Sequence, residues 1–229
     1  MKKTLLLFAM LLGVLGAWAQ TPVLTYTNIT APQELSAEDA KTIREMSAMT
    51  IVAEVDITNS NNHSLLFAAV ADVTKENTTN KDIWGLGIGG NAMRHYISRG
   101  TGAFYSAVAA SNQTKKIAYV YNGGFTYYSD NATEKPLAAN YVKALSTYNG
   151  ENAKFYLGGM KYSTSTNWGV FNGTIHSVRI YNKAMTAEEI AALPKCVVRE
   201  IEDFENGKLY NFVSQRGWLG AKSDNDNVI

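Results

Sequence analysis

Short segments in which apolar and polar residues alternate dominate the chain after residue 50. In residues 50–58, Ile51, Val55 and Ile57 share one face, and polar side chains occupy the other. A period of two is typical of a strand with one buried face. Many such strands joined by polar loops predict an all-β fold, an antiparallel β-sandwich. The same alternation predicts further strands over 64–71, 83–89, 92–98, 116–121, 125–129, 154–158 and 171–181.

Two short helices are expected beside the strands. Ser36 precedes a helical pattern over 37–47, and Thr186 with Glu189 has the spacing of a capping box. Asn122-Gly123-Gly124 separates two strand candidates and is a hairpin signal, because these residues tolerate positive φ. In 83–89 the large residues alternate with glycines, so we expect the large face in the core and the glycine face open to close approach.

The first twenty residues have the three regions of an export signal. Two lysines precede an apolar run from Leu5 to Leu15, and Ala17-Trp18-Ala19 supplies the small residues that signal peptidase reads. We therefore expect a signal peptide over 1–19, cleavage before Gln20, and a mature protein that is secreted, periplasmic or at the cell surface without inserting in a membrane. The pattern changes after Pro194, which predicts a sandwich domain over 20–194 and a C-terminal extension or incomplete second β module over 195–229.

Composition narrows the classes of function. The 229 residues contain 21 Lys and Arg against 20 Asp and Glu, a balance that does not favour nucleic acid as a partner. The single cysteine, Cys196, excludes an internal disulfide and a Cys-rich zinc site. His63, His95 and His176 lack metal-ligand spacing, and we expect them on loop or strand surfaces.

Catalytic chemistry finds little support in the spacing of charged residues. The nearest approach to a hydrolase carboxylate pattern, Glu200–Glu205, places its middle Asp one residue out of phase and lies beyond the predicted sandwich. We therefore expect no catalytic residues and no cofactor. Calcium bound through loop oxygens is a secondary alternative, although its candidates, Asp72, Asp82 and Asp130, form no EF-hand sequence.

The segment over 154–193 carries a family resemblance. A strand ending in Leu157-Gly-Gly is followed by Phe171-x-Gly-x-Ile175, then Val178-Arg-Ile-Tyr181, then a helical turn opened by Thr186. This order resembles the last third of laminin-G-like, concanavalin A-type lectin domains. The resemblance implies a jelly-roll sandwich, and it implies that Arg179 and Tyr181 serve the fold.

A narrower likeness covers the first strands. The segments ITAPQELSAEDAKTIREMSAMTIVAEVDIT and SLLFAAVAD resemble the opening of the carbohydrate-binding module that precedes the catalytic propeller of many sialidases. Ala-Met replaces the usual Asn-Gly before Thr50, and Glu54 stands where an arginine is common. No repeated Ser-x-Asp-x-Gly-x-x-Trp turn occurs, so the chain is not a complete sialidase. The resemblance implies a glycan-binding module.

Binding residues are suggested by strand 92–99. Alternation places Arg94, Tyr96 and Ser98 on one face, a polar set around an aromatic ring. Sugar recognition uses flat aromatic faces, and arginine matches a carboxylate such as that of sialic acid. The resemblance implies that an arginine of this strand contacts the ligand, with Arg94 the first choice and Arg99 the second. It also implies an acidic position near the site, to which Asp72 corresponds loosely. Trp168 is a candidate stacking residue.

The expectation is an exported, non-catalytic lectin-like module for glycans, with sialylated sugars as the leading ligand. Three alternatives stay open. Arg94 and Tyr96 are equally consistent with the solvated face of an outer sheet. The sandwich is also consistent with a structural or adhesion protein that packs on cell-envelope proteins, and with a glycoside hydrolase or lyase whose carboxylate pair comes from separate strands.

Overall fold

The computed structural model describes residues 21–74, 83–98, 102–130, 132–137, 144–161 and 167–194, together with 213–214 and 217–218. The chain divides into two compact units, Pro22–Ala192 and a second made of Met1–Thr21 with Leu193–Ile229. In the second unit, β15 (Val213–Ser214) pairs antiparallel with β16 (Gly217–Trp218). The predicted signal peptide and Cys196 lie outside the described residues, as do Glu200–Glu205.

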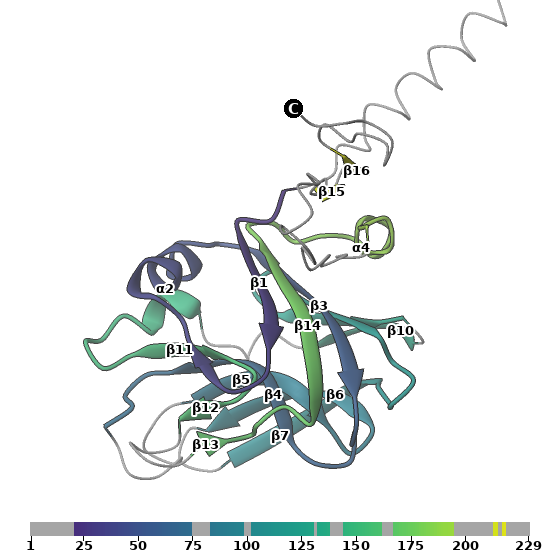
Figure 1. Ribbon diagram of the computed structural model, residues 1–229. Helices are drawn as coiled ribbons and strands as arrows, with labels where there is room; N and C mark the ends of the chain where they lie inside the picture. Colours follow the sequence, from purple (N-terminus) through teal and green to yellow (C-terminus); the bar gives the residue numbers. More distant parts are fainter. Residues whose placement is uncertain are drawn as a thin grey trace, which may run out of the picture. The chain divides into compact units, whose positions relative to one another are not determined.

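The larger unit is an antiparallel sandwich of two six-stranded sheets, drawn one above the other in Figure 1. The predicted all-β fold, an antiparallel β-sandwich, is therefore confirmed. Sheet A contains, in spatial order, β1 (Leu24–Ile29), β14 (Gly173–Tyr181), β3 (Met49–Ile57), β8 (Lys116–Tyr121), β9 (Phe125–Ser129) and β10 (Ala132–Leu137). Sheet B contains β2 (Gln33–Glu34), β11 (Lys154–Leu157), β4 (Ser64–Val70), β5 (Ile83–Gly89), β6 (Ala92–Ser98) and β7 (Gly102–Ala109).

The core lies between the two sheets. Trp84 of sheet B packs against Phe125 of sheet A with ring centroids 4.9 Å apart, and Phe67 meets Trp84 edge to face at 5.4 Å. Tyr119 crosses from sheet A and donates its hydroxyl to the carbonyl oxygen of Gly87 at 2.7 Å. Burial of these rings supplies the main driving force that holds the sheets together.

His95 corrects an expectation. It was expected on the surface, but it is fully buried among core aromatic rings, with Trp84 at 5.6 Å and Phe125 at 5.1 Å between centroids. The reason is the alternation of β6, which puts His95 on the same face as the buried Met93. The other two histidines, His63 and His176, are exposed.

Short helical elements close the ends of the larger unit. Helix α2 (Ala37–Arg44) starts at Ser36, whose hydroxyl accepts from the amide of Asp39 at 3.1 Å. Helix α4 (Ala187–Ala191) has the predicted capping box between Thr186 and Glu189. A 3-10 turn, η2 (Leu145–Thr147), and a ribbon of β12 (Met160–Lys161) with β13 (Asn167–Trp168) complete the elements.

Sheet A also buries polar groups. Arg179 of β14 is fully buried and pairs with Glu54 of β3 at 2.9 Å between Nη2 and Oε1. This fits the structural role expected for Arg179. Thr50 donates its hydroxyl to the carbonyl of Lys183 at 2.6 Å and accepts from the amide of Met185 at 3.0 Å, which ties the segment before α4 to β3. No helix among the described residues is long and apolar enough to cross a membrane.

Candidate functional site

The outer face of sheet B carries the glycines of β5. Trp84, Leu86 and Ile88 point into the core as expected, which leaves Gly85, Gly87 and Gly89 on the outer face. A Cβ at Gly87 would overlap the carbonyl oxygen of Ser64, so β4 and β5 approach each other more closely here than side chains allow. Neighbouring atoms fill the place of a side chain at each of the three glycines, so β5 is buried on this face as well.

The ribbon of β12 and β13 covers part of this face. The carbonyl of Gly169, just after β13, accepts from the amide of Leu65 at 2.7 Å. Gly169 has φ +60, and a Cβ there would lie 2.8 Å from Cγ of Leu65. The close contact sets Trp168 over Tyr96, with ring centroids 4.9 Å apart and planes at 43°. Tyr96 is consequently only 5% exposed, whereas Trp168 stays half-buried.

A shallow, open pocket lies beside the ribbon, with a volume of about 10 Å³, which is room for about one water molecule. Its aromatic side is formed by Tyr96 and Trp168, and its basic side by His63 and Arg94. None of the described residues that line it is acidic, so the pocket offers an apolar surface next to positive charge. The remaining lining residues are Ser64, Leu65, Gly87 and Ile88.

Arg94 is held by the geometry of the β5–β6 hairpin. Gly89 pairs with Ala92 across a two-residue turn, and both turn residues have positive φ, +58 at Gly90 and +56 at Asn91. Such values at both positions are those of a type I′ turn. The side chain of Arg94 extends back over this turn. Its Nη2 atom lies where a Cβ at Gly90 would be. The guanidinium therefore has a defined position at the rim of the pocket.

The structure brings together three of the five predicted binding residues. Arg94, Tyr96 and Trp168 all line the pocket. Asp72 lies beyond the far end of β4, roughly 20 Å along an extended strand from the pocket, and its carboxylate accepts from the amide and hydroxyl of Thr74 at 2.9 and 2.6 Å. Arg99 lies outside the described residues.

His63 is a pocket residue that sequence reasoning missed. It is the last residue of the loop before β4, and its pKa lies below the usual 6.5 because of partial burial and the neighbouring charge of Arg94. A lone histidine in an Asn-rich loop carries no sequence signal for this contact. The Gly-Asn turn between two predicted strands was available as a signal, and it would have placed Arg94 opposite Gly87.

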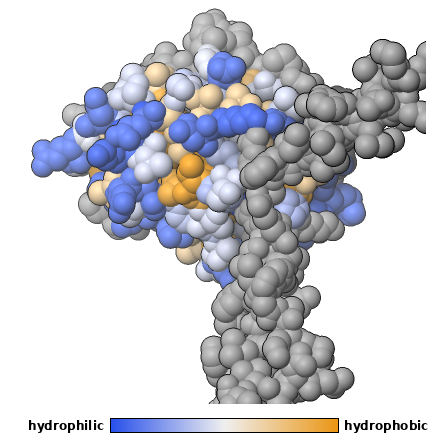
Figure 2. Space-filling view, turned by 90° about the horizontal axis from the view of Figure 1, so that it is seen from above, coloured by the Kyte–Doolittle hydropathy of each residue, from blue (hydrophilic) through white to orange (hydrophobic). Residues whose placement is uncertain are grey.

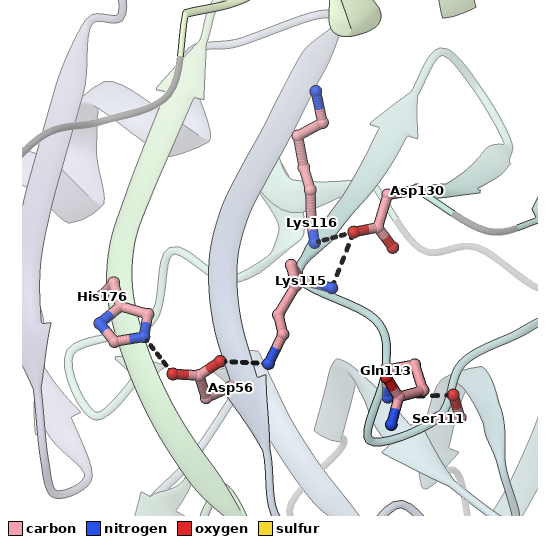
Figure 3. A network of polar contacts seen from close by, with 7 residues as sticks. All are labelled: Asp56, Ser111, Gln113, Lys115, Lys116, Asp130 and His176. Atoms are coloured by element: carbon pink, nitrogen blue, oxygen red, sulfur yellow. Dashed lines mark hydrogen bonds and ion pairs between the residues drawn. The ribbon is translucent and has the colours of Figure 1, made fainter.

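A second polar cluster lies on the outer face of sheet A (Figure 3). The carboxylate of Asp56 contacts Nε2 of His176 at 2.8 Å and Nζ of Lys115 at 2.6 Å. These hydrogen bonds hold the pKa of Asp56 below its ordinary value. All three side chains are about half exposed or more, and the carboxylate already has two side-chain partners. We regard this cluster as a surface ion-pair network.

Calcium was a secondary expectation, and its candidate aspartates lie apart in the described structure. Asp130 accepts from the backbone amides of Lys115 and Lys116 at 2.8 and 3.1 Å (Figure 3), Asp72 is held by Thr74, and Asp82 lies outside the described residues. Among the described residues, no three His, Cys, Asp or Glu side chains are grouped so as to hold a metal ion.

Apolar surface is scarce on the described part of the chain. The exposed large hydrophobic side chains there are Val23 and Val170, at 47% and 43% exposure. Figure 2 shows hydrophilic side chains around a small hydrophobic area on the face in view. A broad apolar docking surface of the kind that marks stable protein partners does not emerge from these residues, which leaves the pocket as the leading candidate site.

Comparison with known proteins identifies the family. The profile described as "Concanavalin A-like lectin/glucanases superfamily" matches residues 28–191, well over half of the chain. The chain belongs to this superfamily. The matched range includes every described residue of the pocket and both sheets apart from the first four residues of β1. No curated protein matches the sequence.

Solved structures similar to this superfamily member include sialidase modules. The CBM40 of a Ruminococcus gnavus IT-sialidase, bound to α2,3-sialyllactose, superposes with TM-score 0.54 at 18% identity, covering 74% of this chain and 97% of that one. NanB sialidase from Streptococcus pneumoniae gives 0.57 at 14% identity, and a leech intramolecular trans-sialidase gives 0.55 at 20%. Each of these two matches covers 76% of this chain and only 28% of the enzyme. The likeness establishes a shared fold.

Proposed function

We propose that this chain is an exported, non-catalytic carbohydrate-binding module whose pocket on the outer face of sheet B binds sialylated glycans. The observation that carries the proposal is the placement of Arg94 beside the Tyr96–Trp168 pair, with no acidic residue among the described lining. The predicted signal peptide supports an encounter with glycans outside the cytoplasm.

The chemistry of the pocket suits an acidic sugar. A guanidinium donates two parallel hydrogen bonds to a carboxylate, and each charge-assisted bond is stronger than a neutral one. The half-buried ring of Trp168 offers the apolar face on which a sugar ring stacks. Tyr96 supports that ring from below and is itself almost fully covered.

Two lines of reasoning favour binding over hydrolysis. Glycoside hydrolysis ordinarily requires a pair of carboxyl groups that flank the bond to be broken, and the described lining of the pocket has neither. Among similar folds, the R. gnavus CBM40 is a separate module bound to sialyllactose, with 97% of its length covered by this chain. This supports a binding role for a sandwich of this fold.

The proposal is tested by titrating the purified chain with 3′-sialyllactose and with lactose in a calorimeter. We expect the sialylated sugar to bind and Arg94→Ala to weaken it by ten- to a hundredfold, because a hydrogen bond to a charged group contributes about 1.5–3 kcal/mol. Lys115→Ala removes a cation from the other polar cluster and is expected to leave affinity unchanged. Folded protein that shows no binding above background on a glycan array contradicts the proposal.

A further inference from the structure

Backbone hydrogen bonds fasten the loop before β4 to the β5–β6 turn. The amide of Gly90 donates to the carbonyl of Asn61 at 3.0 Å, and the amide of Asn91 donates to the carbonyl of Ser60 at 2.9 Å. The side-chain amide of Asn91 adds a bond to Oδ1 of Asn61 at 2.8 Å. These three hydrogen bonds fix the end of the loop relative to the hairpin that carries Arg94. They therefore also fix the position of His63.

His63 and Arg94 meet over Gly89. A Cβ at Gly89 would lie 2.7 Å from Nδ1 of His63 and 3.4 Å from Cδ of Arg94, so both side chains occupy the space that the missing side chain leaves. Both also line the pocket. Two basic side chains from different elements are thus held side by side at the rim of a site where no described lining residue is acidic.

The position of Arg94 disfavours protonation of His63 in the free protein. The pKa of His63 lies below 6.5, first because the imidazole is partly buried and second because Arg94 repels the protonated form. The described titratable and charged groups that face His63 across the pocket are Arg94 and Tyr96. A guanidinium is positively charged in proteins, so the neutral form of His63 is favoured in the free protein.

We infer that His63 is a second recognition residue, which takes up a proton when a carboxylate-bearing sugar enters beside Arg94. The inference rests on the proposed function and deepens it, because it assigns the selectivity for acidic sugars to a pair of groups. A bound carboxylate offsets the repulsion between the two basic side chains and attracts the imidazolium. The pKa of His63 is then higher in the complex than in the free protein.

The sign of the pH dependence follows from linkage. Between the two values of the pKa, binding takes up a proton, so affinity rises as pH falls through the value in the complex and levels off below the value in the free protein. The sugar carboxylate stays ionised above about pH 5, since carboxyl groups titrate near pH 4. A difference of one pH unit between the two values multiplies the affinity about tenfold.

The test is calorimetry on the full chain with 3′-sialyllactose between pH 5 and pH 8, in two buffers of different ionisation enthalpy. We expect affinity about three- to tenfold higher at pH 5.5 than at pH 7.5, with a fraction of a proton taken up per sugar bound. His63→Gln keeps a hydrogen-bonding side chain of similar reach but cannot take up a proton, and we expect its affinity to lack the rise toward low pH. His176→Gln is the matched control on the other sheet, where the imidazole contacts Asp56, and it should retain the rise.

The outcomes separate the inference from the proposed function. Absence of 3′-sialyllactose binding at every pH overturns both. Binding without proton uptake, or a His63→Gln variant that keeps the full pH dependence, overturns the inference alone. Should His63→Gln not fold, an NMR titration of the His63 ring in the free and sugar-bound chain decides the question, because an unchanged pKa on binding contradicts proton uptake.

Discussion

Single glycines determine where the basic groups of the pocket lie. Gly90 meets two demands, since its φ of +58 suits a residue without a side chain and Nη2 of Arg94 occupies the place of a Cβ. Gly123, in the β8–β9 hairpin, shares the first demand with φ +71 and has nothing within 4 Å of a Cβ. Alanine at either position strains the backbone, but alanine at Gly90 also displaces the Arg94 guanidinium. Comparing the two variants therefore separates the two effects.

Substitution at these glycines is expected to affect stability alike and binding differently. Gly90→Ala and Gly123→Ala should each lower the free energy of unfolding by about 1–2 kcal/mol, the cost of a left-handed conformation for alanine. Only Gly90→Ala should also weaken 3′-sialyllactose binding, by roughly tenfold, because the methyl group forces the guanidinium aside. Urea denaturation and calorimetry measure the two effects. Equal affinities in the two variants would remove the Arg94 guanidinium from the site.

At the scale of elements, α4 depends on its first turn. The amide of Glu189 donates to the Thr186 hydroxyl at 3.3 Å, and the amide of Thr186 donates to the Glu189 carboxylate at 3.0 Å. A helix of five residues has few other bonds of its own. Its buried Ile190 shows that the helix also contributes an apolar contact.

Thr186→Ala is expected to lower the free energy of unfolding by about 1 kcal/mol, because it removes the acceptor of the capping box. Thr58→Ala, at an exposed position after β3, is the control and should change stability by less than about 0.5 kcal/mol. Urea denaturation of the two variants provides the comparison. A Thr186→Ala variant as stable as the control would show that packing alone holds α4 in place.

Elements with a clear period and marked ends were predictable from the sequence. The predicted strands 83–89, 92–98, 116–121 and 125–129 have the bounds of β5, β6, β8 and β9, since alternation identifies each strand and turn residues end it. β1 was not predicted, because the alternation of Leu24 and Tyr26 is short and breaks before Ile29, at Asn28 with its φ of +53. β12 and β13 have two residues each, too few for any period.

The candidate site was predictable only in part. Arg94 and Tyr96 share a strand face, so alternation groups them, and Trp168 was suggested as an aromatic residue that stacks on sugar. Trp168 covers Tyr96 because the β12–β13 ribbon packs on sheet B. His63 lies near Arg94 because backbone hydrogen bonds join the loop before β4 to the β5–β6 turn. Both contacts join segments far apart in the chain. Such contacts depend on three-dimensional packing, which the local pattern of apolar and polar residues does not predict.

At the scale of the whole molecule, two tryptophans have opposite roles. Trp84 is fully buried where the sheets meet, whereas Trp168 lies half-buried on the outer face at the pocket. Trp84→Ala should lower the free energy of unfolding by about 3–5 kcal/mol, as loss of a large core side chain does. Trp168→Ala should cost far less stability and weaken 3′-sialyllactose binding about tenfold.

Urea denaturation and calorimetry on both variants make the comparison, and Trp84→Phe provides a milder core change that keeps an aromatic ring. Binding by Trp84→Phe equal to that of the unmodified chain is expected, because the substitution lies on the inner side of β5. Full sugar affinity in Trp168→Ala would contradict the role given to the outer ring.

The place of β14 between β1 and β3 governs the order in which the sandwich can assemble. In the described part of sheet A, β1 is the edge strand and its neighbour is β14, so Leu24 gains its strand partner Ile180 after β14 has been synthesised. Contacts between such distant parts of a chain make folding slow. During synthesis, sheet A therefore stays incomplete until nearly the whole sandwich has left the ribosome.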